Sequence, residues 1–236
     1  MDIFWSTVQQ STGLYTSGRD MLKFEPVSLF DELKERYKGT EVENQYLKCP
    51  SAVIELKKTY VIKSDIDYNI YFGENNSIYS DLYDQDFFNS SIKVWSLEDT
   101  MFGYDFYYMF YSEKSVAITM LPAFMHDSPF KDAYFTPGSF DISKWFRPLT
   151  TGMIHPKRTD IKIKRGDALF YVRFSTDNKI KLRKFDMSPK LSFFSKEALN
   201  LKSHLPNRNL KYLYNIFNQS KYNKKIIKEI KQNLSE

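Results

Sequence analysis

Cysteine, glycine and histidine are scarce in this chain of 236 residues, which has one cysteine, eight glycines and three histidines. The single cysteine, Cys49, excludes an intramolecular disulfide and any metal cluster held by several cysteines. It is typical of a protein kept in a reducing compartment. No run of about 18 apolar residues is present, and the first ten residues are too polar for a secretory signal peptide. The sequence therefore predicts a soluble protein that is not secreted and has no membrane partner.

The usual signatures of enzymes and nucleotide-binding proteins are also missing. The chain has no Gly-x-Ser-x-Gly nucleophile elbow, no Walker A loop and no Gly-x-Gly-x-x-Gly fingerprint. Cys49 precedes a proline and has no histidine near it in the sequence, a setting more typical of a small buried residue than of a nucleophile. These absences favour a non-enzymatic protein that needs no cofactor.

Aromatic residues are abundant instead, at 17% of the chain, with 20 Phe and 17 Tyr. Such a composition suits a β-rich core. The clearest strands lie between residues 161 and 182, where Ile161 and Ile163 alternate with lysines and Gly166-Asp167 breaks the run. Ala168–Phe174 predicts a second, more buried strand, and a turn at residues 176–178 leads into a third.

Other short segments show strand or helix patterns. Strands are expected at Ala52–Leu56, Thr59–Lys63, Tyr68–Phe72 and Ser90–Leu97, and a hairpin over Phe102–Met120 with its turn at Ser112–Ser115. Leu29–Lys38 predicts a short helix with Ser28 as its N-cap, and Leu210–Leu234 predicts one or two helices, depending on whether Gln219-Ser220 interrupts the pattern.

Together these patterns predict a mainly β protein built on a β-sandwich or jelly-roll-like domain, with a short N-terminal helix and a basic C-terminal helical segment. The expected parts are an N-terminal arm with the short helix (residues 1–44), the β-rich domain (45–195) and the helical segment (196–236).

The positive charge is concentrated at the C-terminal end. Residues 201–236 hold eight Lys or Arg and two acidic residues, whereas the other 200 residues hold 26 basic and 27 acidic ones. The candidate partner-binding residues of this segment are its clustered lysines: Lys221, Lys224, Lys225, Lys228 and Lys231. Three interpretations stay open for them: a solvated face of a helix that covers the domain's own core, a protein partner, or nucleic acid.

Two further sets of residues are candidates for binding. Phe4 and Trp5 are expected to anchor the N-terminal arm on a neighbouring protein or on the domain's own core. A β-rich fold also allows His126, Asp127 and His155 to meet from separate strands, as the ligands of cupin-type metal sites do. The alternative function is therefore a cupin-like metal-dependent enzyme, although no spacing of these residues demands it.

Two blocks of the sequence resemble uncharacterised proteins of tailed bacteriophages. The first is Leu47–Phe72, with its Cys-Pro, Lys-x-Thr-Tyr and Ser-Asp-x-Asp steps, and the second is Ile161–Phe174, a basic strand followed by Gly-Asp. The resemblance covers residues 45–190, implies a phage source and a β-rich fold, and names no site residue. With it, we expect a non-enzymatic protein that binds a protein partner or itself. It would act in the virion or as an accessory factor in the host cytoplasm.

Overall fold

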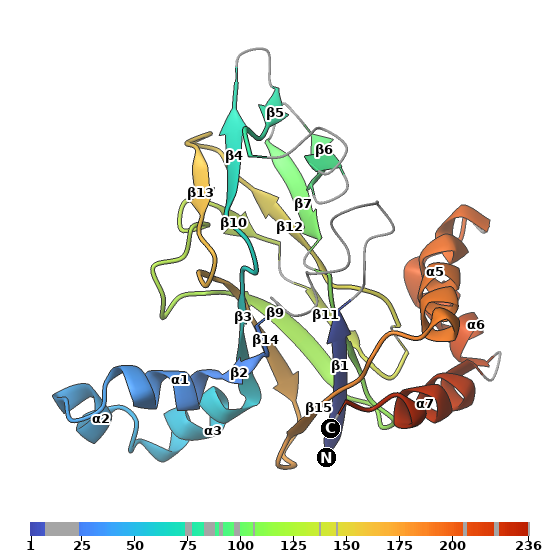
Figure 1. Ribbon diagram of the computed structural model, residues 1–236, viewed down its shortest axis with the longest axis horizontal. Helices are drawn as coiled ribbons and strands as arrows, with labels where there is room; N and C mark the ends of the chain where they lie inside the picture. The colour runs from blue at the N-terminus through green and yellow to red at the C-terminus, as the bar shows by residue number, and fades with distance from the viewer. Residues whose placement is uncertain are drawn as a thin grey trace.

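The computed structural model describes residues 1–7, 24–73, 77–82, 88–89, 92–96, 100–105, 107–136, 138–144, 146–204, 207–219 and 222–235. Over these ranges the chain is mainly β, as expected, with a group of helices on either side of the strands (Figure 1). None of the helices in the described ranges is long and apolar enough to cross a bilayer.

The strands are β1 (Asp2–Thr7), β2 (Val27–Ser28), β3 (Thr59–Lys63), β4 (Tyr68–Phe72), β5 (Ile78–Tyr79), β6 (Ile92–Ser96), β7 (Met101–Asp105), β8 (Tyr108–Tyr111), β9 (Ala117–Pro122), β10 (Tyr134–Phe135), β11 (Gly138–Asp141), β12 (Thr150–Ile154), β13 (Ile161–Ile163), β14 (Ala168–Ser175) and β15 (Lys181–Lys184). The helices are α1 (Leu29–Arg36), α2 (Glu41–Gln45), α3 (Pro50–Lys58), α5 (Pro189–His204), α6 (Leu210–Gln219) and α7 (Tyr222–Gln232).

Among the described residues the strands form four sheets, with the orders β15-β1-β8, β10-β12-β7-β6, β11-β9-β14-β3-β2 and β13-β4-β5. Strands β3, β4, β13, β14 and β15 confirm the predictions made for their segments. The predicted break between β13 and β14 is confirmed by Gly166, which has φ +93°, a conformation that favours glycine.

The central strands of two sheets are buried on both faces, because each sheet lies between the same central core and one group of helices. In β1, Ile3 and Trp5 belong to the central core, whereas Phe4 points to the opposite side and packs with α5–α7. In β14, Phe170 and Val172 belong to the central core, and residues of the opposite face pack with α1–α3. Alternation along a strand thus produces two buried faces, which explains the continuous burial of β1 and β14.

Helix α1 forms where the sequence predicts it. The Ser28 hydroxyl accepts a hydrogen bond from the Asp31 amide at 3.1 Å, so Ser28 is the N-cap. Leu29 and Leu33 are fully buried against the five-stranded sheet. Of the one or two helices left open for Leu210–Leu234, the described residues show two, since α6 ends at Gln219 and α7 begins at Tyr222.

The prediction of a strand at Ala52–Leu56 is wrong, because these residues belong to helix α3. Pro50 occupies the first turn of the helix, where a missing amide hydrogen does no harm, and the Val53 amide donates to the Cys49 carbonyl at 3.0 Å. The β-branched pair in this segment favours a strand, and the packing of α3 against α1 and β3 overrides that preference.

The predicted hairpin over Phe102–Met120 is also wrong. The turn after β8 lies near its expected position, but β8 pairs with β1, whereas β9 pairs with β11 and β14. The turn therefore connects two sheets instead of two neighbouring strands. The local pattern shows where a strand lies, and its partner is decided by contacts distant in sequence.

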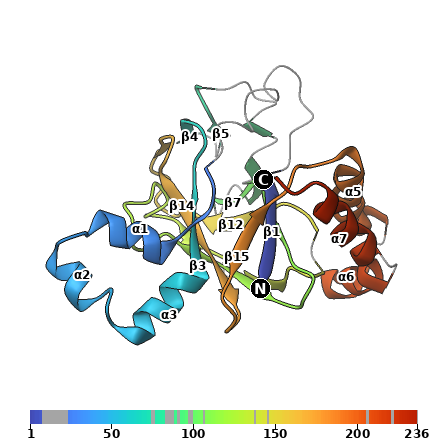
Figure 2. The ribbon, with the colours of Figure 1, turned by 60° about the horizontal axis from the view of Figure 1, so that its bottom comes forward.

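Residues 2–7 are not an arm but the middle strand of the sheet β15-β1-β8, paired parallel to β15 and antiparallel to β8. The predicted helical segment begins at residue 196, whereas α5 begins at Pro189, so the expected boundary at residue 195 falls inside this helix. Helices α5–α7 cover the outer face of this sheet, and α1–α3 lie on the other side of the molecule (Figure 2).

Candidate functional site beside helix α7

Helix α7 has one face in the protein core and one face in solvent. Ile226 and Ile230, four residues apart, are fully buried. They pack with Phe4, Met109 and Tyr111 of the sheet β15-β1-β8. Lys224, Lys225, Lys228 and Lys231 are exposed on the other side. Burial of the isoleucines therefore fixes the direction in which the lysines point.

Polar contacts fix the helix further. The Tyr111 hydroxyl donates to Asn223 Oδ1 at 2.8 Å, and burial raises the pKa of this phenol, which keeps it protonated as a donor. Glu229 accepts from Lys190 Nζ at 2.8 Å and from the Ser188 hydroxyl at 3.0 Å, and these bonds lower the pKa of its carboxyl. The one acidic residue of α7 is thus occupied by α5 and the segment before it.

The chain after α7 is also held. The Asp186 amide donates to the Asn233 carbonyl at 2.8 Å, and the Ser235 amide donates to the Lys184 carbonyl at 3.0 Å. Residues 233–235 therefore pair with the end of β15, and α7 cannot swing away from the sheet without breaking these bonds.

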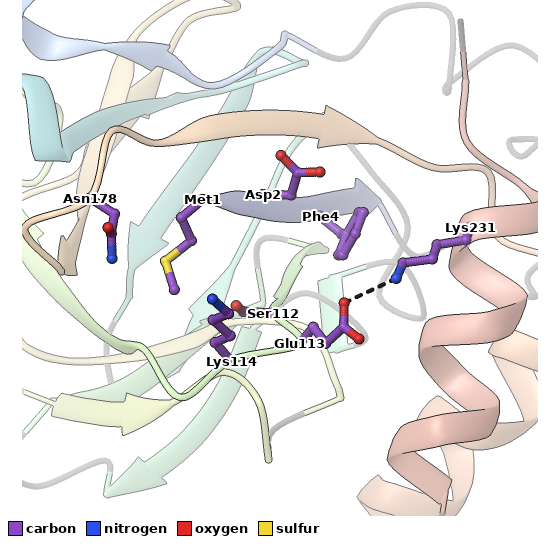
Figure 3. A pocket seen from close by; sticks show the side chains of 8 residues that line it. All are labelled: Met1, Asp2, Phe4, Ser112, Glu113, Lys114, Asn178 and Lys231. Atoms are coloured by element: carbon purple, nitrogen blue, oxygen red, sulfur yellow. Dashed lines mark hydrogen bonds and ion pairs between the residues drawn. The ribbon is translucent and has the colours of Figure 1, made fainter.

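Two hollows lie side by side between α7, β1 and the turn after β8, and together we call them the α7 cleft. The smaller one, of about 310 Å³, is lined by Met1, Asp2, Phe4, Ser112, Glu113, Lys114, Asn178 and Lys231 (Figure 3). The larger one, of about 720 Å³, is lined by Glu113, Asn223, Lys224, Ile227, Lys228, Lys231 and Gln232.

Glu113 and Lys231 line both hollows and separate them. The Lys231 ammonium lies 3.0 Å from Glu113 Oε2, and Figure 3 shows this ion pair reaching from α7 to the turn after β8. Both side chains are more than half exposed, so the pair is worth at most about 1 kcal/mol. An incoming carboxylate can therefore take the place of Glu113 at small cost.

The remaining lysines of the cleft are available to an anion. Neither Lys224 nor Lys228 forms an ion pair within the described part of the chain, and Lys225 lies 5.7 Å from the centre of the Tyr222 ring. Between Lys224 and Lys228 lies Ile227, which offers a small apolar surface. The cleft thus combines lysines that have no ion-pair partner among the described residues with a small apolar surface at Ile227.

The residues that the sequence predicts to bind a partner lie in different parts of the structure. Lys224, Lys228 and Lys231 line the cleft, Lys225 lies beside it on α7, and Lys221 lies outside the described residues. Phe4 and Trp5 are 2% and 3% exposed and pack in the protein's own cores. Of the two alternatives left open for this pair, docking on the domain's own core is the one that the structure shows.

The histidines do not assemble into one site. His126 Nδ1 lies 2.6 Å from the Tyr171 hydroxyl and its Nε2 lies 3.0 Å from Glu32 Oε1. His155 is buried elsewhere, with its ring nitrogens 3.2 Å and 2.7 Å from the carbonyls of Asp132 and Thr159. The Asp127 carboxylate is exposed and faces Lys131 at 3.7 Å. Within the described ranges there is no group of three His, Cys, Asp or Glu residues placed to hold a metal.

The chain Tyr171–His126–Glu32 has the order hydroxyl, imidazole, carboxylate that activates a nucleophile in some enzymes. Tyr171, however, is fully buried, and its oxygen already accepts the Met125 amide at 3.0 Å. Burial also raises the pKa of this phenol. The arrangement therefore connects α1 to β14 and does not present a reactive group to a substrate.

Two residues of the cleft, Glu113 and Lys114, were not singled out from the sequence. They lie in the turn that the sequence predicts after β8, among ordinary polar turn residues. Only the pairing of β8 with β1 brings this turn to α7, and no local signal in the sequence shows that pairing.

Comparisons with protein-family models, with curated proteins and with solved structures each found no match. The phage resemblance therefore stays a prediction, and the function is argued from the site.

Proposed function

We propose that this protein is a non-enzymatic binding protein whose α7 cleft takes an acidic segment of a protein partner. The observation that carries the proposal is the pair Lys224 and Lys228, exposed at the edge of a hollow and without a carboxylate partner in the described part of the chain. Charge complementarity then selects a ligand that brings carboxylates, and the Ile227 surface favours an apolar residue beside them.

A protein partner fits this cleft better than nucleic acid does. The described lining residues include four lysines and no arginine, and the one aromatic among them, Phe4, is buried. Readers of nucleic acid bases combine cations with arginine forks or exposed rings for stacking.

The setting that we propose follows from the resemblance to tailed-phage proteins. The partner is then a component of the virion, or a protein of the host cytoplasm that this chain binds as an accessory factor. We also retain the β-sandwich or jelly-roll-like arrangement as a proposal for how the four sheets are related.

The test is the binding of a fluorescent acidic peptide, a run of ten glutamates containing one leucine, followed by fluorescence anisotropy. We expect the full chain to bind it, with an affinity that falls as salt is raised. The double variant K224E/K228E should lower the affinity at least tenfold, because two attractive charges become repulsive.

A matched control is available in α1 and the turn that follows it. Lys34 and Lys38 are also exposed and four residues apart, so K34E/K38E makes the same change in net charge at another place. This control should bind the peptide within about twofold of the unchanged chain. Equal losses in both variants would show that only net charge matters, and would contradict a site at α7. Tight binding of a 12-base-pair DNA duplex without binding of the peptide would show that the cleft binds nucleic acid and not an acidic protein segment.

A further inference from the structure

The sheet β10-β12-β7-β6 carries an exposed tryptophan that the β strands make room for. Trp95 of β6 is 51% exposed, yet the edge of its six-membered ring lies against two glycines. A Cβ on Gly103 would lie 2.8 Å from Trp95 Cζ2, and a Cβ on Gly152 would lie 2.7 Å from Trp95 Cζ3. Any other residue at either position would push the indole away.

The glycines are not required by the backbone. Neither Gly103 nor Gly152 has the positive φ that favours glycine, and they face each other in the register of β7 and β12. Glycine inside a strand weakens it, and often marks a place where something approaches the backbone closely. Here the approaching group is the Trp95 ring, which is seated on the sheet with much of its surface in solvent.

A second exposed aromatic residue shares this face. Tyr134 of β10 is 67% exposed and stands opposite Ile154 of β12, which is two residues from Gly152. Residues paired across strands, and residues two apart along a strand, lie on the same face of a sheet. Trp95 and Tyr134, on the two edge strands, therefore present their rings to the same side of the sheet, and the Trp95 ring reaches across β7 to Gly152 of β12.

The surroundings of the two rings carry hydroxyl groups. The Thr136 hydroxyl lies 3.0 Å from the position of a Cβ on Gly152, and Thr150 lies beside Gly103. The register adds one positive charge, Lys93 opposite Gly103. A phosphate backbone would need an excess of cations, which this face lacks.

We propose that this face is a binding platform for a neutral carbohydrate, with Trp95 and Tyr134 as its stacking rings. The C–H bonds on one face of a sugar ring carry partial positive charge, and they meet the negative face of an aromatic ring. The hydroxyls at the edge of the sugar find partners in threonine side chains such as Thr136. Two rings on one face select an oligosaccharide over a single sugar. The strands that form this site are not those that border the α7 cleft, and the proposal does not depend on that cleft.

The test is isothermal titration of the full chain with cellotetraose, chitotetraose and maltotetraose as separate probes. At least one of them should bind, and W95A should weaken that binding about tenfold or more, as expected for loss of a stacking ring. Y134A should weaken it about threefold or more. Y212A removes a tyrosine that is 44% exposed on α6, and should leave the affinity unchanged.

Three outcomes would overturn the proposal. Failure of all three probes to bind the unchanged chain would mean that Trp95 only covers the glycine backbone. An unchanged affinity in Y134A, or in a folded W95A, would place any sugar elsewhere. Binding of a twelve-base thymidine oligonucleotide that is lost in W95A, without sugar binding, would identify a base-stacking site. Y134A keeps the test valid if W95A does not fold, because Tyr134 is mostly in solvent.

Discussion

Helices α1–α3 and α5–α7 each cover the outer face of a sheet whose inner face lies against the same central core. They differ in where their charged groups lie. In the first group, Glu32 is largely buried and receives Lys63 Nζ and His126 Nε2, each at 3.0 Å from its Oε1. In the second group, apolar packing and the bonds that Glu229 accepts from Lys190 and Ser188 hold the helices. Lys224 and Lys228 of α7 remain in solvent and form no ion pair among the described residues.

The comparison shows that a charged side chain can either contribute to folding or stay available for binding. A charge that is paired below the surface contributes to folding and makes stability depend on pH. A charge that is left unpaired on the surface contributes little to folding, and stays available to a partner. The N-terminal helices should therefore lose stability in acid through Glu32, and the unpaired lysines of α7 should make binding of a partner depend on salt.

The largest effect is expected from the packing of α7. Ile230→Ala removes a fully buried side chain from the C-terminal core and should lower the free energy of unfolding by about 2–5 kcal/mol. Lys228→Ala, two residues earlier and exposed, should change it by less than about 0.5 kcal/mol. Urea unfolding followed by circular dichroism measures both. Similar values for the two variants would show that α7 is not part of the folded core.

The N-terminal group should respond to loss of its buried charge. Burial opposes ionisation of Glu32, but hydrogen bonds and positive charge from His126 and Lys63 outweigh it and lower the pKa of this carboxyl from 4.5 to about 2. Glu32→Gln should lower the free energy of unfolding at pH 7 by about 1.5–3 kcal/mol. Glu35→Gln changes an exposed residue of the same helix and should have little effect.

The same variant tests the pH dependence. Between pH 4.5 and 2 the unfolded chain binds a proton at Glu32 that the folded chain does not, so stability from this group rises with pH and is complete above 4.5. It is lost as the pH falls through about 2. The difference in unfolding free energy between the unchanged chain and Glu32→Gln should shrink over this window. A difference that stays constant from pH 7 to pH 2.5 would contradict the buried pair.

A smaller effect is expected at the start of α1. Ser28→Ala removes the hydroxyl that accepts the Asp31 amide, and should lower the free energy of unfolding by about 1 kcal/mol. Thr40 occupies the corresponding position before α2 without a capping bond from its side chain, so Thr40→Ala should have a smaller effect. Denaturant midpoints measure this, and an equal loss in both would argue against capping at Ser28.

The smallest effect on stability is expected in the cleft. Glu113→Gln breaks an exposed ion pair and should change the free energy of unfolding by less than about 0.5 kcal/mol. It also frees Lys231 for the acidic peptide, so affinity should rise about two- to fivefold. Lys231→Gln should lower the affinity instead. A loss of affinity in Glu113→Gln would mean that this carboxylate contacts the ligand as an acceptor.

Much of the secondary structure follows from local patterns in the sequence. Strands β3, β4, β13 and β14 show the expected apolar runs or alternation, and α1 has its capping serine and buried leucines. The predicted helical segment starts too late, at residue 196, although Ser188 caps helix α5 by accepting the Leu191 amide at 3.2 Å and Pro189 follows in the first helical position.

Only part of the candidate site can be predicted from the sequence, because the rest depends on strand pairing between distant segments. The α7 lysines stand out because they cluster in a segment with few acidic residues. Glu113 and Lys114 reach the same cleft only because β8 pairs with β1, and β1 lies more than one hundred residues away along the chain. The platform at Trp95 likewise depends on the pairing of β7 with β12, which brings Gly103 and Gly152 together.

Lysine labelling in the presence of the acidic peptide tests the central claim most directly. Each exposed lysine is acetylated by a limiting reagent with and without peptide, and the extent of modification is read by mass spectrometry of the digested chain. The account predicts that the peptide protects Lys224, Lys228 and Lys231, and leaves Lys34 and Lys38 unchanged. Protection spread evenly over all exposed lysines, or absent from α7, would contradict it.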